Sequence, residues 1–65
     1  MILKEVFNKF LGETIEVRDA SDEHFLDIYK VPYVDDLNTP YDDFFVTLVS
    51  REPDDKIIAY ILTDD

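Results

Sequence analysis

The sequence predicts a small α+β domain, in which an antiparallel sheet of three to five strands packs with an N-terminal helix and a second short helix. Two observations support this class. Apolar residues recur with a helical period near the N-terminus, whereas they alternate with a period of two in residues 14–19, 44–49 and 57–62. The chain has 65 residues, of which 46% are apolar, and this indicates a single domain over residues 1–65.

The first predicted element is a helix over about residues 2–11. Its apolar residues stand at i, i+3, i+4, i+7 and i+8: Leu3, Val6, Phe7, Phe10 and Leu11. Gly12 follows, and glycine commonly ends a helix. Residues 14–19 then predict a strand with one buried face, because Ile15 and Val17 alternate with polar residues.

Residues 21–30 (SDEHFLDIYK) are compatible with two structures. A helix is favoured, because Ser21 suits an N-cap and the apolar residues come in adjacent pairs. Those residues stand at i, i+1, i+3 and i+4: Phe25, Leu26, Ile28 and Tyr29. The alternative is the second strand of a hairpin. After this segment, residues 32–37 (PYVDDL) predict a short strand and residues 38–43 a turn.

The C-terminal third predicts an antiparallel hairpin. Two alternating apolar segments, residues 44–49 and 57–62, flank the polar loop REPDDK. Both segments carry apolar residues on both faces, so both strands are expected to be central in the sheet rather than at an edge.

Charge is the strongest compositional signal. The chain has 16 Asp and Glu against 6 Lys and Arg, a net charge of −10, and twelve of the acids lie in residues 21–65. Such a field repels nucleic acids and anionic membranes and attracts basic surfaces. We therefore expect a basic protein as partner, with no direct nucleic-acid binding and no membrane binding. A solvated face that only maintains solubility is the alternative.

Residues suited to catalysis or metal binding are few. There is no cysteine, one histidine (His24) and one glycine (Gly12), which excludes thiolate sites, multi-histidine sites and glycine-rich phosphate loops. The paired aspartates point to opposite faces of a strand, so they are poorly placed for acid–base catalysis. We expect no enzyme activity, no cofactor and no metal site. No apolar run approaches the ~20 residues of a membrane span, and the N-terminus does not resemble a signal peptide, so a cytoplasmic location is expected.

Several residues share their order and spacing with one known family. In the C-terminal hairpin these are Ser50, Pro53, Lys56, Ala59, Ile61 and Asp64. Further upstream they are Thr39, Tyr41 and Asp42, together with Gly12 and the strand 15–19. At these positions the chain resembles the phage protein inhibitors of uracil-DNA glycosylase, over about two-thirds of its length. It departs from them at Asp19-Ala20-Ser21, where the family has Glu-Ser-Ile, and over residues 20–38, which are fewer than in the family.

The resemblance implies a DNA mimic. In that family, acids on the first strand and the second helix engage the DNA-binding loops of the enzyme. An apolar pocket between that helix and the sheet receives a leucine that the enzyme otherwise inserts into DNA. By position, Asp19 corresponds to the first-strand acid, and Val46, Leu48 and Ile61 to the lining of the pocket. The charge and apolar patterns add the other candidates, and the full set expected to bind the partner is Asp19, Ser21, Glu23, Leu26, Asp27, Ile28, Tyr29, Val46, Leu48 and Ile61. For any one of the apolar residues, an ordinary place in the core is the simpler interpretation.

The expected function is therefore a DNA-mimicking inhibitor that blocks uracil excision as a monomer in a one-to-one complex. Two alternatives remain open. One is an acidic mimic directed at restriction or CRISPR enzymes. The other is a small acidic interaction domain that pairs with a basic protein or with itself through Tyr33, Tyr41 and Phe44.

Overall fold

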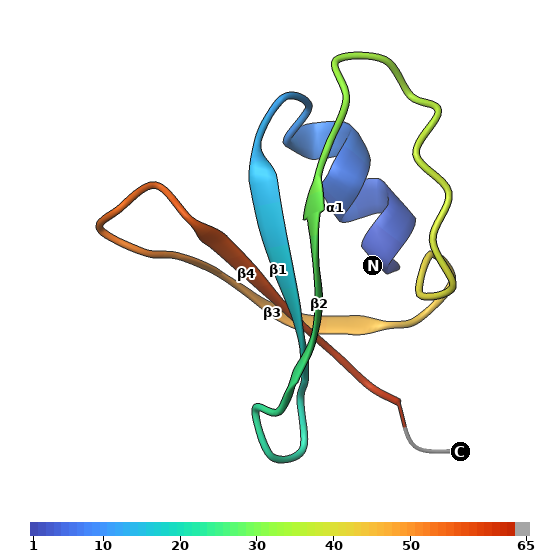
Figure 1. Cartoon of the computed structure of the whole chain (residues 1–65). Helices are drawn as coiled ribbons and strands as arrows, with labels where there is room; N and C mark the ends of the chain where they lie inside the picture. The colour runs from blue at the N-terminus through green and yellow to red at the C-terminus, as the bar shows by residue number, and fades with distance from the viewer. Residues whose placement is uncertain (64–65) are drawn as a thin grey trace.

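The computed structural model describes residues 1–63 and contains one helix and four strands (Figure 1). The elements are α1 (Leu3–Lys9), β1 (Thr14–Asp19), β2 (Phe25–Lys30), β3 (Val46–Arg51) and β4 (Ile57–Ile61). They confirm the predicted α+β class, the N-terminal helix and the C-terminal hairpin. Asp64, one of the residues that carry the resemblance, lies outside the described residues.

The sheet has the strand order β2-β1-β4-β3 and is mixed rather than purely antiparallel. The two hairpins, β1–β2 and β3–β4, are antiparallel, whereas β1 and β4 run parallel at the centre. The expectation of two central C-terminal strands is correct for β4 but wrong for β3, which lies at an edge. The difference follows from composition, because β4 has only apolar residues and a tyrosine, whereas Thr47, Ser50 and Arg51 give β3 polar positions that suit an edge.

Helix α1 covers one face of the sheet, and the core lies between them (Figure 1). The fully buried residues include three from the helix and five from the two central strands: Leu3, Val6, Phe7, Ile15, Val17, Ile57, Ala59 and Ile61. Val31 and Val46 complete this layer. The first three residues of the predicted helical stripe therefore meet the inward positions of the strands in one core, and Phe10 packs against it, whereas Leu11 lies beyond the end of α1 and is exposed. Within residues 1–63, no helix is long and apolar enough to cross a membrane.

Both ends of α1 are held by residues that are distant in sequence. The first two N–H groups of the helix, at Leu3 and Lys4, donate to the carbonyls of Phe44 (3.0 Å) and Asp42 (2.9 Å), which satisfies donors that a helix cannot pair internally. Beyond the other end, Gly12 has φ +83°, a conformation that favours glycine. A Cβ atom on Gly12 would lie only 2.3 Å from the exposed Tyr33 ring, which would have to move aside, so the positive φ is the stronger reason for glycine here.

The helix predicted for residues 21–30 is wrong, because the chain turns there and returns as strand β2. Two side chains shape the turn. The carboxylates of Asp19 and Asp22 each accept a hydrogen bond, at 2.9 Å, from the backbone N–H two residues further along. Glu23 has φ 61°, which is incompatible with a continuing right-handed helix. These contacts reverse the chain and bring β2 alongside β1.

A β-bulge explains why β2 has an apolar spacing typical of a helix. The pairing of β1 with β2 skips one residue, Leu26, where the register shifts. Phe25 and Ile28 therefore share a face of the sheet although they are three residues apart, opposite Arg18 and Glu16. In a regular strand, residues three apart would point to opposite faces.

Residues 31–45 form a long connection on the helix side of the sheet (Figure 1). The short strand predicted for residues 32–37 is not formed, and these residues have no regular structure. The Lys4 ammonium group instead fastens the connection to α1, by donating to the carbonyl of Leu37 and pairing with the carboxylate of Asp35 at 3.4 Å.

The aromatic residues of this connection differ in exposure. Tyr33 is 80% exposed, whereas Tyr41 and Phe44 are half-buried and stack edge to face with their ring centroids 5.6 Å apart. Of the three aromatic residues through which the alternative interaction domain would pair, only Tyr33 is therefore well exposed.

Candidate functional site

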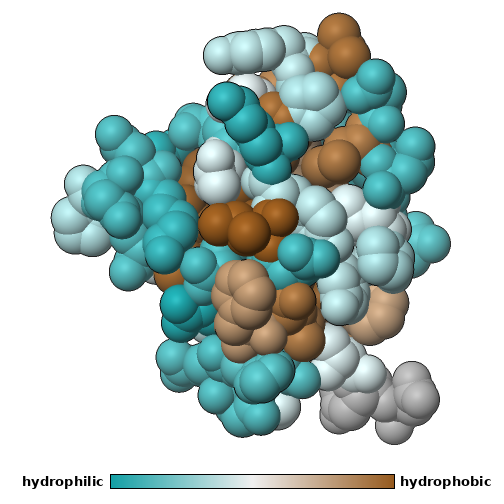
Figure 2. Space-filling model, in the orientation of Figure 1, coloured by the Kyte–Doolittle hydropathy of each residue, from teal (hydrophilic) through white to brown (hydrophobic). Residues whose placement is uncertain are grey.

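The face of the sheet opposite α1 has no helix over it in the part of the chain that the structure describes, and we call it the open face. Its residues follow from the register of the ladders: Glu16, Arg18, Phe25, Ile28, Leu48, Ser50, Ile58 and Tyr60. Three apolar side chains on it are strongly exposed, Leu48 at 58%, Phe25 at 50% and Ile28 at 45%. Figure 2 shows apolar residues gathered in the middle of one face of the molecule, with hydrophilic residues around them.

An ion cluster lies at the centre of the open face. The Glu16 carboxylate is almost fully buried and accepts hydrogen bonds from the Arg18 guanidinium and, at 3.2 Å, from the Lys56 ammonium group. Burial by itself would raise the pKa of Glu16, but the hydrogen bonds from Arg18 and Lys56 outweigh it and lower the pKa below its ordinary value. Glu16 is thus a structural anion that fixes two cations over the sheet.

Glu16 predicts how stability depends on pH. Because its pKa is lowered in the folded state, the carboxylate stabilises the fold fully above the ordinary glutamate pKa and loses this contribution as the pH falls through the folded pKa. Glu16→Gln is expected to lower the free energy of unfolding by about 1 kcal/mol at pH 7, since Arg18 and Lys56 are partly exposed and screened. Urea titrations at pH 7 and pH 3 should show the difference shrinking on acidification.

The exposed Glu23 supplies the control for this prediction, because its carboxylate has no lysine or arginine partner among residues 1–63. Glu23→Gln should leave stability at pH 7 unchanged or slightly higher, as it reduces the repulsion between acids. A difference between wild type and Glu16→Gln that is the same at both pH values would contradict the assigned role of Glu16.

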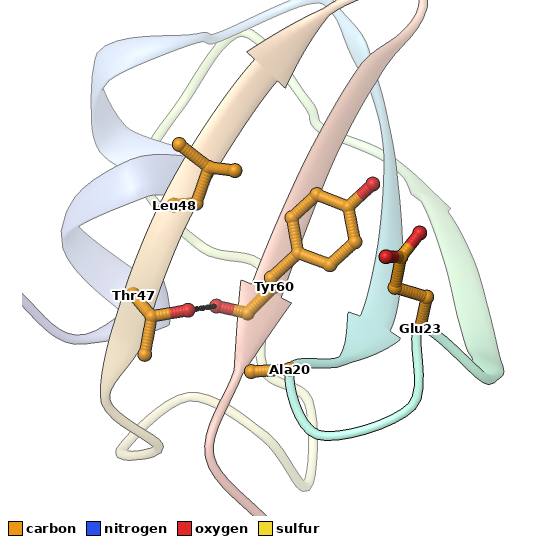
Figure 3. A pocket seen from close by; sticks show the side chains of 5 residues that line it. All are labelled: Ala20, Glu23, Thr47, Leu48 and Tyr60. Carbon is orange, nitrogen blue, oxygen red and sulfur yellow. Dashed lines mark hydrogen bonds between the residues drawn. The ribbon is translucent and has the colours of Figure 1, made fainter.

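A shallow pocket of about 170 Å³ lies at one end of the open face. It is lined by Ala20, Glu23, Thr47, Leu48 and Tyr60, which come from β3, β4 and the β1–β2 turn. Figure 3 shows the Tyr60 ring between Leu48 of the edge strand and the Glu23 carboxylate of the turn. The Thr47 hydroxyl donates to the Tyr60 carbonyl at 3.4 Å, which ties the two strands together beside the pocket. The pocket therefore has an apolar wall and an acidic wall.

The acidic wall belongs to the β1–β2 turn, residues 19–24, which we call the acidic turn. Hydrogen bonds from the Thr63 hydroxyl (2.6 Å) and from the backbone and hydroxyl of Ser21 hold the Asp19 carboxylate and lower its pKa. Asp22 is held by the backbone of His24. Both carboxylates are therefore held in defined positions, and the lowered pKa of Asp19 keeps that group ionised at neutral pH.

The structure divides the predicted binding residues between the two faces of the sheet. On or beside the open face lie Glu23, Ile28 and Leu48, and Ser21 belongs to the same turn as Glu23, whereas the register places Asp19 beside Ile61 on the other side of the sheet. The core on the helix side contains Leu26, Tyr29, Val46 and Ile61. A pocket between a second helix and the sheet is not formed in the described residues, because β2 occupies the segment predicted for that helix.

Tyr29 and Asp27, which lie on the helix side of β2, make contacts that stabilise the fold instead of lining a pocket. The Tyr29 ring packs edge to face on Phe7, with centroids 5.8 Å apart, and its hydroxyl donates to the Asp27 carboxylate at 3.1 Å. Burial and the neighbouring Asp27 charge raise the pKa of Tyr29 to about 12. This hydroxyl is therefore a donor at physiological pH, and the pair stabilises the sheet edge against α1.

Four residues at the open face were not anticipated from the sequence: Ala20, Phe25, Thr47 and Tyr60. A signal for Tyr60 was present, since pairing the two C-terminal strands across the REPDDK loop places Tyr60 opposite Leu48. No comparable signal existed for Phe25, whose face depends on the bulge at Leu26.

No family model, curated protein or solved structure matches this chain. The resemblance to the glycosylase inhibitors therefore stays a prediction. Within residues 1–63, no three His, Cys, Asp or Glu side chains are grouped so that they could hold a metal ion. What the described residues offer chemically is an apolar surface with fixed carboxylates on one rim, which suits binding to a protein with exposed basic groups.

Proposed function

We propose that this chain is a non-catalytic protein-binding domain that imitates DNA and occupies the DNA-binding cleft of uracil-DNA glycosylase. The observation that carries the proposal is the position of the acidic turn directly beside the apolar pocket of the open face. A basic protein that approaches this end of the domain meets negative charge and an apolar contact together.

The distribution of ion pairs supports an acidic binding surface. Within residues 1–63, only four carboxylates lie within ion-pair distance of a lysine or arginine: Glu13, Glu16, Asp35 and Asp55. The other described acids have no lysine or arginine within that distance, and some of them, such as Asp19 and Asp42, accept hydrogen bonds within the domain. Clefts that bind DNA are built for about one negative charge per 1.7 Å of duplex. Carboxylates presented there can accept the charge-assisted hydrogen bonds that phosphates would otherwise accept.

The rigidity of the acidic turn favours binding further. Asp19 and Asp22 are held by hydrogen bonds within the turn, so less conformational entropy is lost when they engage a partner. Freely moving carboxylates on a disordered tail would lose more conformational entropy on binding.

Apolar contacts would supply selectivity that charge alone cannot. Leu48 and Ile28 are exposed on the open face, whereas Val46 and Ile61 are buried in the core. The apolar contact is therefore assigned to Leu48 and Ile28 on the sheet surface, and not to a socket beneath a second helix. The resemblance in the C-terminal hairpin selects uracil-DNA glycosylase as the first target among basic DNA-binding proteins.

Calorimetry with purified uracil-DNA glycosylase, together with an assay of uracil excision, tests the proposal. We expect one-to-one binding, inhibition of excision, and an affinity that falls as salt screens the charges. If neither binding heat nor inhibition is detected at micromolar protein, the proposed target is wrong. If the chain instead inhibits a restriction or CRISPR nuclease, it is still a DNA mimic, but that nuclease is its target.

Two matched variants locate the binding surface. Glu23→Gln removes one charge at the rim of the pocket, and Asp36→Asn removes one charge in the connection on the helix side. Glu23→Gln is expected to weaken binding by about tenfold, and Asp36→Asn by less than about twofold, since a remote charge acts only through steering. Equal effects would show that the acidic turn is not the contact.

A further inference from the structure

The sheet has two edge strands, β2 and β3, and they differ in whether their outward-pointing backbone groups are already hydrogen-bonded. In β2, the Val31 N–H donates to the Glu13 carbonyl of the neighbouring segment at 2.8 Å. Because hydrogen-bonded pairs alternate along an antiparallel ladder, Tyr29 and Asp27 also face β1 with their backbone groups. The backbone N–H and carbonyl of Ile28 therefore point away from β1. The Ile28 N–H is not left open. It donates to the side chain of its neighbour Asp27 at 2.8 Å, so the β2 edge is blocked by a charged residue.

The edge of β3 has no such protection. The Glu52 N–H donates to the Lys56 carbonyl at 2.7 Å, and the register continues from there without a shift as far as Leu48. In this alternation Ser50 and Leu48 face β4, so the N–H and carbonyl groups of Val49 and Arg51 point outward. Among residues 47–51 none is proline and only Arg51 is charged, and its side chain is engaged by Glu13 and the Phe10 ring rather than by an outward backbone group.

The available part of the β3 edge is short and well defined. At its beginning the Val46 N–H already donates to the Met1 carbonyl at 2.8 Å, and Ile2 forms a bridge with Phe45. Residues 47–51 remain, a length of about 17 Å at the usual rise of a strand. This length accommodates one short extended segment.

Charge determines what kind of segment fits. Glu52, Asp54 and Asp55 follow the edge at one end, and Asp42 and Asp43 precede it at the other. The one cation on the edge, Arg51, is already shared between Glu13 (3.5 Å) and Asp55 (4.0 Å). A second copy of the chain would bring another net charge of −10 against this one, whereas a segment rich in lysine or arginine would be attracted, above all by Glu52, Asp54 and Asp55.

We propose that the β3 edge binds an extended basic segment of a partner protein, which adds to the sheet as a fifth strand. Backbone hydrogen bonds to Val49 and Arg51 provide the pairing, and the flanking acids provide the selection for basic sequence. Alternate side chains of the added strand lie beside Leu48 and the open-face pocket. This goes beyond the proposed function, because it specifies a strand-pairing mode that any basic partner with an extended segment can use.

Backbone amide exchange measured by NMR on the whole chain tests the proposal. The probe is a short peptide of alternating lysine and valine, and its control is the same peptide N-methylated at every residue, which retains the charge but removes the donors on both edges of the peptide. At millimolar concentration the first peptide is expected to slow exchange at Val49 and Arg51 by about tenfold, and the second to leave it unchanged. Equal protection by both peptides, or none by either, would overturn the proposal.

A pair of variants tests the same edge from the side of the protein. Arg51→Pro removes an outward N–H without breaking the ladder to β4, and Arg51→Ala removes the same side chain but keeps the N–H. Peptide binding should be lost in Arg51→Pro and retained in Arg51→Ala. Should Arg51→Pro not fold, the N-methylated peptide decides. Concentration-dependent dimers that protect Val49 and Arg51 without peptide would instead identify a second copy as the occupant and overturn the assignment to a basic segment. Because no glycosylase is used, these outcomes are separate from those that test the proposed function.

Discussion

Replacing Phe7 with alanine is expected to remove most of the stability of this domain. The Phe7 side chain is 1% exposed and joins α1 to the sheet, where its ring meets Tyr29 edge to face. Removing a buried phenylalanine costs about 3–5 kcal/mol, because transfer energy is lost and a cavity remains. A domain of 65 residues has a total stability of only about 3–10 kcal/mol. Phe7→Ala should therefore be partly unfolded at 25 °C, as measured by circular dichroism and urea titration.

Phe25 provides a matched control, because it is the same residue type on the opposite face of the sheet. Its side chain is 50% exposed on the open face. Phe25→Ala is expected to cost less than about 1 kcal/mol, since little buried area is lost. A loss of stability in Phe25→Ala equal to that in Phe7→Ala would show that the open face is covered in solution and that the assignment of the core to one face is wrong.

The parts of the fold that sequence predicts correctly are those whose burial is regular. Leu3, Val6 and Phe7 stand at helical spacing and are buried together in α1. Ile57, Ala59 and Ile61 alternate without interruption and all face the helix. In α1 the hydrophobic period equals that of the helix, and β4 is apolar on both faces, as is typical of a central strand, so local sequence carries enough information.

The main errors come from two β-bulges, which change the period within a strand. In β2 the bulge at Leu26 places Phe25 and Ile28 on one face and produces a spacing typical of a helix. In β3 the register shift between Val46 and Leu48 puts these two residues on opposite faces, although residues two apart normally share one. Bulges depend on pairing with a neighbouring strand, and a single sequence does not show where that pairing shifts.

The candidate site was predictable in its charge but not in its position. Asp19 and Glu23 were expected to contribute to binding, and the structure places both in one turn, with Glu23 at the rim of a pocket. The apolar wall was expected beneath a second helix. That expectation depended on treating residues 21–30 as a helix and on grouping Val46 with Leu48. Once both bulges are known, the exposed leucine and the acidic turn fall on the same side of the sheet.

Leu48→Asp is expected to weaken binding to the target by about 100-fold, or about 2.8 kcal/mol, which is the largest effect that we predict for a change on the open face. Leu48 is 58% exposed, so its replacement should change the stability of the isolated domain little. In the complex, however, a carboxylate in place of the apolar wall beside Tyr60 would lose its water without gaining a partner. Calorimetry with uracil-DNA glycosylase, and urea titration of the variant alone, measure the two effects separately.

Leu11 supplies the matched control for this change, because it is a second exposed leucine, 38% accessible, and follows α1 on the opposite side of the sheet. Leu11→Asp adds the same charge and removes the same side chain, so it should alter affinity by less than about threefold. Comparable losses in the two variants would mean that the loss at Leu48 is not specific to the open face, since an added negative charge by itself favours binding to a basic partner. A loss confined to Leu48→Asp would mean that the apolar wall of the pocket provides the selectivity that the acidic turn by itself cannot.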